Sequence, residues 1–431
     1  MLDIKIIVGA NYGDEGKGLV TDYVCRKAID VHKWDSRVLN VLANGGCQRG
    51  HTVVTKDGKA HVFHHFGAGT FAGADTYFCS RFIINPMRFV DEYNTLATKF
   101  NAMPHSCMSS QCRLQLPGDI AANWYLERSR GDNKHGSTGC GIWETVKRFK
   151  KSQEKKFLRP TEHDRCAGYT LAEFMNFSDD EKFQIIRESG RYWLELTKVE
   201  NDIEESYFPY LKLFLNDGFI KHYIEDCKRM FSMCKIVSDK LAFKDYSTVV
   251  LEYGQGLLLD PKYSKTKAFS EYGYALTNTA HTTPSYVGAY DAGWAINVAE
   301  MSGKTVRDIE VIYVTRPYIT RHGADDFKED LALSKLLAGK DKTNVYNEWQ
   351  GTIKYKSLDE LQKSMLHSRI NEDFDKFKHD YAIADHEARK ICALTHLDEL
   401  DDVDLISEFM TTSGMYVSYG PTARDVTTML S

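Results

Sequence analysis

The residues best suited to chemistry lie in the stretch 9–18, which reads GANYGDEGKG. Glycines let a backbone approach phosphate oxygens closely, and the ammonium group of Lys17 can neutralise them. The neighbouring carboxylates Asp14 and Glu15 are unusual beside phosphate, because they repel it unless they bind magnesium or take a proton. The stretch indicates phosphate binding, and Asp14 is predicted to take part in the chemistry.

A strand and a helix are predicted to position this loop. The apolar run Ile4 to Val8 precedes it, and apolar residues recur at helical spacing between residues 19 and 28. This order brings backbone N–H groups and the positive end of a helix to one point, where an anion can bind. The loop departs from the Walker A pattern at Asn11 and Gly18, which argues against an ordinary phosphate-loop kinase or NTPase. A tight turn with a solvated acidic pair is the structural alternative.

A second glycine segment, residues 45–52 (GGCQRGHT), follows the apolar run Val38 to Leu42. Taken with residues 13–18, it resembles the adenylosuccinate synthetase family, whose signature is G-D-E-G-K-G followed by G-G-x-N-A-G-H-T. Further matches follow in the same order at residues 63–64, 136–142, 252–256, 258–260, 318–321, 395–398 and 418–421. The resemblance covers about residues 3 to 426.

The resemblance implies an α/β fold with a mostly parallel central sheet flanked by helices, similar to that of phosphate-loop NTPases. At about residues 146–245 the sequence becomes charged and aromatic-rich with helical spacing, and a strand pattern returns at Thr248 to Glu252. We therefore expect a single domain, residues 1–431, into which a helical cap is inserted at about 146–245.

The resemblance also implies a two-step ligation. GTP phosphorylates O6 of inosine monophosphate, and the amine of L-aspartate then displaces phosphate from C6 to give adenylosuccinate. In the matching positions, Asp14 would remove the N1 proton and bind Mg²⁺ together with the Gly50 carbonyl. His51 would donate to the γ-phosphoryl group, Lys17 would stabilise its charge, and Gln255 would bind O6.

By the same resemblance, the residues that would bind the donor nucleotide are Gly13, Glu15, Gly16, Lys17, Gly18, Thr52, Asp398, Ser418, Gly420 and Pro421. A carboxylate at Asp398 can accept from both N1 and N2 of guanine, which favours GTP. The family motif T-K-L-D reads Thr395-His396-Leu397-Asp398 here, so a histidine replaces the lysine that usually packs on the base. ATP therefore stays open as the donor.

The residues that the resemblance assigns to binding of the two substrates that are joined are Asn11, Gln48, Ser137, Thr138, Arg148, Gln255, Thr343, Asn344, Asn347, Gln350 and Lys354. Arg148 would reach the nucleotide across a dimer interface, which implies a homodimer. The family's bacterial form binds aspartate with a run of arginines that is absent here. The segment 343–351 instead resembles the T-N-x-x-N-x-x-Q-G motif of the archaeal and phage branch.

Two alternatives remain open for the reaction. Part of the phage branch makes the 2-amino product from deoxyguanylate with ATP or GTP, and those relatives often replace the catalytic aspartate with a smaller residue. Asp14 is retained, which favours inosine monophosphate, although Cys140, Trp143 and Tyr12 indicate a remodelled acceptor pocket. A catalytically silent nucleotide-binding relative is disfavoured because Asp14, Lys17, His51 and Gln255 are retained together.

Composition excludes several classes of protein. The net charge of −5 gives no general reason to expect nucleic acid, and the basic stretch from Lys147 to Arg159 is interpreted as a solvated loop beside a phosphate-binding site. We find no apolar run of membrane-spanning length and no room for a secretory signal before the first strand. The ten cysteines form no C-x-x-C pair, as is typical of reduced thiols. We expect a cytoplasmic protein.

Overall fold

The fold was analysed in a computed structural model, which describes residues 1–32, 37–131, 136–156, 168–201, 209–214, 216–260, 286–323, 327–384, 387–400 and 413–429. Arg159, at the end of the basic stretch, lies outside these residues, as do parts of the expected helical cap. Statements below concern the described residues.

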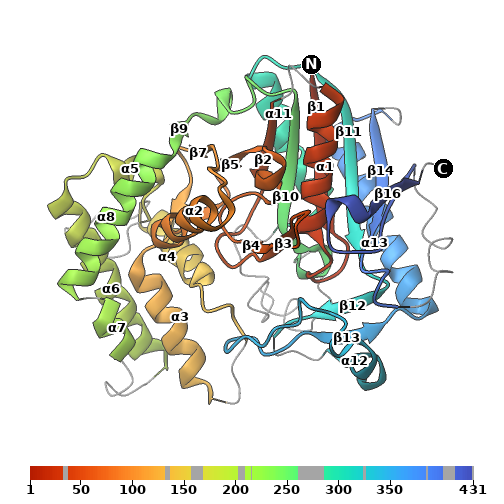
Figure 1. Ribbon diagram of the computed structural model, residues 1–431. Helices are drawn as coiled ribbons and strands as arrows, with labels where there is room; N and C mark the ends of the chain where they lie inside the picture. Colours follow the sequence, from red (N-terminus) through yellow and green to blue (C-terminus); the bar gives the residue numbers. More distant parts are fainter. Residues whose placement is uncertain are drawn as a thin grey trace.

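A ten-stranded sheet forms the centre of the molecule. Its strands are β1 (Leu2–Gly9), β2 (Val38–Leu42), β5 (Asp75–Phe78), β7 (Ser106–Ser109), β9 (Lys235–Val237), β10 (Thr248–Gly256), β11 (Val306–Thr315), β14 (Ala388–Leu394), β15 (Met415–Ser418) and β16 (Val426–Met429). They lie in the order β16-β15-β14-β11-β1-β10-β2-β5-β7-β9 (Figure 1). Neighbouring strands run parallel apart from β16, which is antiparallel to β15. The predicted mostly parallel sheet is confirmed.

Three small two-stranded sheets lie outside the central one. They pair β3 (His51–Val54) with β4 (Ala60–Phe63), β6 (Ile83–Ile84) with β8 (Arg113–Leu114), and β12 (Tyr318–Arg321) with β13 (Lys354–Ser357). The first and third of these carry residues that meet at the loop after β1, as described below.

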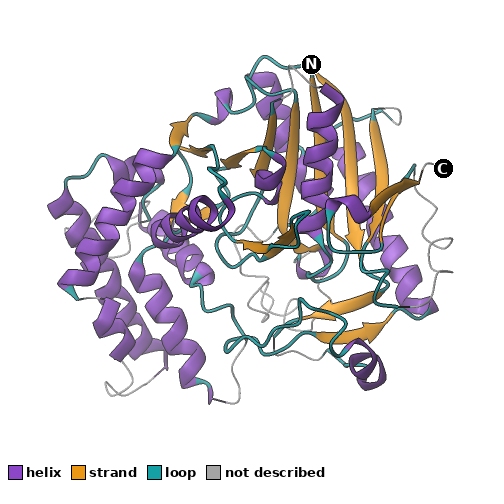
Figure 2. Cartoon of the chain, viewed as in Figure 1, coloured by secondary structure: helices purple, strands orange, loops and turns teal. Residues whose placement is uncertain are grey.

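Helices cover the sheet and extend away from one end of it (Figure 2). They are α1 (Lys17–His32), α2 (Pro86–Phe100), α3 (Pro117–Ser129), α4 (Ile142–Lys156), α5 (Leu171–Met175), α6 (Asp179–Asn201), α7 (Pro209–Phe214), α8 (Asp217–Met233), α10 (Ala289–Ala292), α11 (Trp294–Met301), α12 (Leu331–Leu337) and α13 (Glu360–Asp380). None of the described helices is long and apolar enough to cross a membrane.

The helices from α3 to α8 gather on the side of the molecule beyond β7 and β9 (Figure 1). Residues of α4 to α8 fall in the interval 146–245, where the sequence predicts a helical cap. Two details differ from that expectation. The helical group already begins with α3, which contacts α4, α6 and α7, and β9 returns to pair with β7 at the edge of the central sheet.

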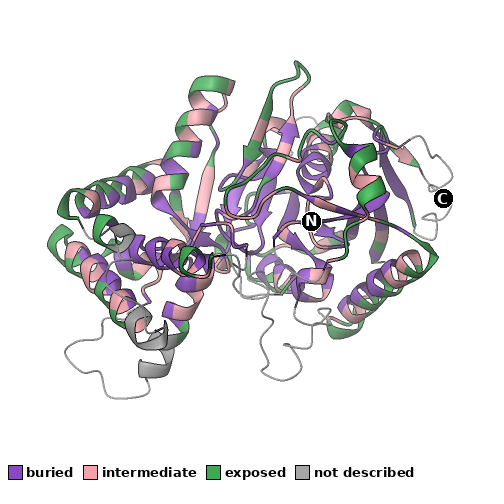
Figure 3. Ribbon diagram, turned by 90° about the horizontal axis from the view of Figure 1, so that it is seen from below, coloured by how far each residue is buried: buried purple, intermediate pink, exposed green. Residues whose placement is uncertain are grey.

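The centre of the sheet is buried because its strands are apolar on both faces, as parallel strands covered by helices must be. Most residues of β1 and β10 and all residues of β2 are buried. Figure 3 shows buried residues in the interior of the molecule and exposed ones along its outer helices. β1 and β10 end at the same edge of the sheet, so the loop after β1 and the residues at the end of β10 are brought together. This edge is where open parallel sheets bind ligands.

Candidate active site

The glycine loop between β1 and α1 lies at the carboxyl edge of the sheet, as predicted. Lys17 begins α1 and is buried, with its Nζ 2.9 Å from Oε2 of Glu15. The other oxygen of Glu15 accepts a hydrogen bond of 3.0 Å from the backbone N–H of Asn11. Both oxygens of the Glu15 carboxylate are used beneath the loop, so nucleotide binding by Glu15 stays a prediction. Its backbone stays available as a loop group.

Asp14 projects from the loop in a left-handed backbone conformation, with φ of 59°. Aspartate tolerates this region better than most residues, and neighbouring elements hold it there. Arg316 donates to the carbonyl of Asp14, and Thr320 of β12 donates to the carbonyl of Gly13 at 2.6 Å. The Asp14 carboxylate is half-buried and lies 3.6 Å from Nε2 of His322. The Asp14 carboxylate is thus held on a supported turn.

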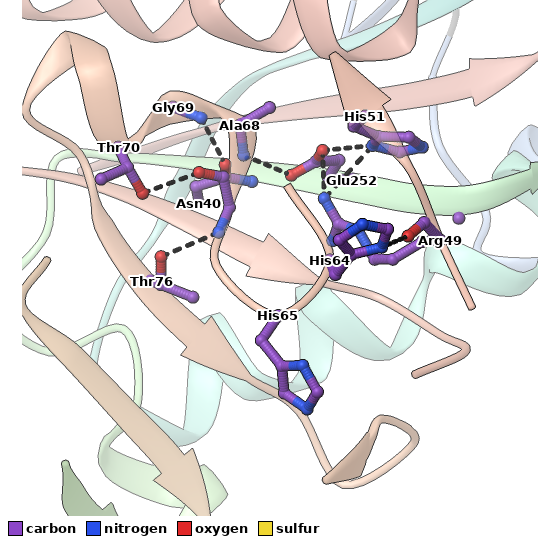
Figure 4. A network of polar contacts seen from close by, with 12 residues as sticks. Asn40, Arg49, His51, His64, His65, Ala68, Gly69, Thr70, Thr76 and Glu252 are labelled. Atoms are coloured by element: carbon purple, nitrogen blue, oxygen red, sulfur yellow. Dashed lines mark hydrogen bonds and ion pairs between the residues drawn. The ribbon is translucent and has the colours of Figure 1, made fainter. Parts of the chain in front are cut away.

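His51 lies at the start of β3 in a buried polar network (Figure 4). Its Nδ1 and the Nη2 of Arg49 both hydrogen-bond Oε1 of Glu252, and the N–H of Ala68 donates to Oε2 at 3.1 Å. Burial would raise the pKa of Glu252, but Arg49 and His51 outweigh it and hold the pKa at about 2. An ionised carboxylate only accepts hydrogen bonds, so Nδ1 of His51 carries a proton.

The Nε2 atom of His51 is consequently the nitrogen left for chemistry. Burial, followed by the charge of Arg49, lowers the pKa of His51 to about 4 despite its contact with Glu252. The free imidazole is neutral at pH 7, with a lone pair on Nε2. An anion next to Nε2 would favour protonation there, and Glu252 would stabilise the imidazolium. A proton-donating role requires this change of charge.

Several buried polar atoms around this network make no hydrogen bond within the described structure. They are Nε2 of His51, Nε and Nη1 of Arg49, both amide atoms of Gln48, and Nδ1 of His322. Buried polar groups are normally paired, so a cluster of unpaired ones indicates a place where a polar ligand binds. Gln48 was predicted to bind substrate, and its free amide is consistent with that role.

Gln255 is at the end of β10 and is mostly buried. Its Oε1 accepts a hydrogen bond of 3.3 Å from Nδ2 of Asn44, which fixes the orientation of the amide. The Asn11 side chain is paired within the protein. Its Nδ2 donates to Thr315 at 3.1 Å and its Oδ1 accepts from Arg369 at 2.9 Å, so its side chain is committed to the scaffold. Substrate binding by Asn11 stays a prediction.

The segments predicted to bind the donor nucleotide meet around the start of α1. The side chain of Thr395 donates to the Glu15 carbonyl at 2.7 Å, and Leu397 donates to the carbonyl of Ser418 at 3.1 Å. Gly18 approaches β3 so closely that a Cβ there would lie 2.6 Å from the Thr52 carbonyl oxygen. Asp398 and Pro421 are exposed beside these segments, where a base could reach them.

The Ser137 and Thr138 segment, residues 136–141, is held by α3. Glu127 accepts from the N–H groups of Gly136 and Ser137 at 3.0 and 3.2 Å, and the Ser137 hydroxyl donates to Asn123 at 3.1 Å. A phosphate only accepts hydrogen bonds from such groups. Ser137 would therefore have to exchange its partners to bind the 5′-phosphate as predicted.

Arg148 is paired within the helical region. Its guanidinium is buried, with Nε and Nη2 each 2.8 Å from an oxygen of Asp119, and Nη2 also donates to the Leu114 carbonyl at 2.8 Å. Releasing it would leave a buried Asp119 without its partner, a change that costs about 3–5 kcal/mol. Nucleotide binding by Arg148 and the homodimer inferred from it both stay predictions.

The residues predicted to bind aspartate mostly build their own loop. Asn344 exchanges two hydrogen bonds with the backbone of Ile353, and Oδ1 of Asn347 accepts from the N–H groups of residues 349 and 350. Thr343 binds Arg316 and Asp341, and Lys354 donates to the Gly323 carbonyl at 2.9 Å. Direct binding of aspartate by these side chains stays a prediction.

Few protein atoms at this site would coordinate a magnesium ion. No group of three or more His, Cys, Asp or Glu side chains that could hold a metal occurs in the described part of the chain. The predicted ligands, the Asp14 carboxylate and the Gly50 carbonyl, are both oxygen donors on solvent-accessible loops. This set fits Mg²⁺, which is usually bound by one or two carboxylates together with substrate phosphates.

Three residues of the site had no role in the sequence analysis. Glu252 orients His51, Arg316 joins the Asp14 loop to Asp341 at 2.7 Å, and His322 faces the Asp14 carboxylate. Glu252 follows the apolar run Val249 to Leu251 within β10, and Arg316 and His322 come directly after β11 and β12, which is a detectable signal. Their partners lie far away in sequence, so their roles needed the fold.

Comparison with known proteins agrees with the motif assignment. The family model for adenylosuccinate synthetase matches residues 6–411. The adenylosuccinate synthetase of Lysinibacillus sphaericus is 27% identical over 261 residues, which cover 59% of this chain and only 52% of that protein. That of Prochlorococcus marinus AS9601 is 25% identical over 426 residues, covering 97% of this chain and 82% of the relative.

A solved structure shares the fold at much lower identity. It is the cyanophage S-2L succinoaminodeoxyadenylate synthetase, PurZ, bound to dGMP and to dATP as an energy donor. The two chains align with a TM-score of 0.57 and 15% identity, covering 100% of this chain and 96% of the phage protein. At this identity the likeness establishes the fold. The family model, the collinear motifs and the fold agree, and this chain belongs to the adenylosuccinate synthetase family.

Proposed function

We propose that this protein ligates L-aspartate to C6 of inosine monophosphate, driven by GTP and Mg²⁺, with adenylosuccinate as the product. The observation that carries the proposal is the convergence of Asp14, His51 and Gln255 at one edge of the sheet, beside a cluster of unpaired buried polar atoms. Family membership supports the reaction class.

Each residue of the site has a defined task in this proposal. Asp14 takes the N1 proton, which sends electron density to O6 of the purine. Nε2 of His51 donates to the γ-phosphoryl group, and the Glu252 carboxylate, which contacts Nδ1, stabilises the imidazolium that forms. Lys17 and the loop N–H groups stabilise phosphoryl charge, although Glu15 already compensates part of the Lys17 charge. Mg²⁺, held by Asp14 and Gly50, would neutralise the donor phosphates.

Acceptor choice is the first test. We expect kcat/KM for inosine monophosphate to exceed that for deoxyguanylate by about ten- to a hundredfold. The reason is that a 2-amino group beside N1 would crowd the Asp14 carboxylate and be buried without a partner, at about 1–3 kcal/mol. Phosphate release is measured with each monophosphate, aspartate and either GTP or ATP. Faster release with deoxyguanylate would overturn the inosine assignment and favour the 2-amino reaction. Absence of release with every acceptor would favour a silent relative.

Donor choice is tested separately at Asp398. Asp398→Ala should weaken GTP binding more than ATP binding, because only guanine loses two hydrogen bonds to a charged group, each worth about 1.5–3 kcal/mol. Asp398 is exposed, so the substitution should leave folding intact. Binding of each triphosphate is measured by calorimetry, with the exposed Asp57→Ala as a matched control. Equal losses for both nucleotides would show that Asp398 does not read the base.

A further inference from the structure

The segment 343–351 is anchored at both ends and presents its tip to the helical region. Asn347 and Gly351 exchange backbone hydrogen bonds of 3.0 and 2.7 Å, which close the segment into a tight turn. The Asn347 side chain then orders the N–H groups of Trp349 and Gln350. Trp349 and Gln350 are therefore held at the tip of the turn.

Trp349 contacts α3 and the 136–141 segment at once. Its ring stacks on Trp124 with centroids 5.6 Å apart and an interplanar angle of 29°, and the Arg128 guanidinium lies 5.2 Å from its centroid. The indole N–H of Trp124 donates to the Gly139 carbonyl at 2.6 Å. Aromatic pairs and cation–π contacts of this kind each contribute to holding two elements together.

Gly139 is shaped for this contact. It has φ of +71°, and a Cβ at this position would lie 2.6 Å from the Trp349 ring. The adjacent Gln350 donates to the Gly136 carbonyl at 3.3 Å. The tip of the 343–351 segment thus packs on the backbone of the segment that carries Ser137 and Thr138.

We infer that Trp349 is a positioning residue that couples the binding of aspartate to the binding of the acceptor nucleotide. This inference rests on the proposed function, in which segment 136–141 serves the acceptor monophosphate and segment 343–351 serves aspartate. When the two segments share one contact, ordering either of them lowers the cost of ordering the other.

The test measures this coupling at equilibrium. Inosine monophosphate is titrated calorimetrically into the protein with and without aspartate, in the absence of triphosphate so that no reaction occurs. Wild-type protein should bind the nucleotide more tightly when aspartate is present, within the usual coupling range of about 5- to 150-fold. Trp349→Ala should reduce that ratio to near one, and Trp349→Phe should restore most of it.

Two further variants separate coupling from general damage. Tyr346→Ala removes an aromatic residue from the same turn that is 70% exposed, and it should leave the ratio unchanged. Gly139→Ala disturbs the same contact from the 136–141 segment, because its Cβ would clash with the Trp349 ring. It should reduce the ratio of nucleotide affinities as Trp349→Ala does. Thermal unfolding confirms that each variant is folded. If folded Trp349→Ala keeps the wild-type ratio, or if wild type shows no coupling, the inference is wrong. Absence of ligation by wild type would overturn the proposed function itself.

Discussion

Asp14→Ala and His51→Ala should each lower kcat by about 100-fold or more, which is the usual contribution of positioned proton transfer and charge stabilisation. For Asp14 the loss follows from the missing base at N1. For His51 it follows from the missing donor at Nε2, the ring nitrogen that Glu252 leaves unpaired. The measurement is steady-state phosphate release with inosine monophosphate, aspartate and GTP.

Exposed residues of the same two types serve as controls for these variants. His105 is 82% exposed and Asp57 is 53% exposed, so His105→Ala and Asp57→Ala should leave kcat unchanged. Urea unfolding of all four variants excludes loss of folding as the cause. Turnover above about one third of wild type for either site variant would remove that residue from its assigned role.

Glu252→Gln is expected to affect both stability and catalysis. The substitution keeps the volume but leaves Arg49, which is fully buried, without a charged partner, and breaking a buried ion pair in this way costs about 3–5 kcal/mol. It also removes the carboxylate that would stabilise a protonated His51. We expect a lower urea midpoint together with a large loss of kcat.

A double variant separates the two effects of Glu252. In Arg49→Met with Glu252→Gln, the buried guanidinium is gone, so the urea midpoint should recover much of its wild-type value. The kcat should stay low, because His51 still lacks its carboxylate. If kcat recovers along with stability, Glu252 acts on catalysis only through the fold.

Local sequence by itself determined the phosphate loop and its flanking elements. The apolar run Ile4 to Val8 and the helical spacing after Lys17 correspond to β1 and α1, and the run Val38 to Leu42 is β2 residue for residue. These predictions succeed because periodicity and glycine content report local backbone geometry. The order of such elements, read with the family motifs, was enough to predict a mostly parallel sheet.

The tertiary structure alone decided which side chains face a ligand and which serve the scaffold. Arg148 lies in a basic stretch, yet it is buried against Asp119, and the Asn11 amide is taken up by Thr315 and Arg369. His51 and Glu252 are 201 positions apart in the sequence, yet their side chains meet in the folded protein (Figure 4). Strand order and packing across the whole chain determine which groups become hydrogen-bonding partners. Residue type and local spacing therefore do not predict these partners.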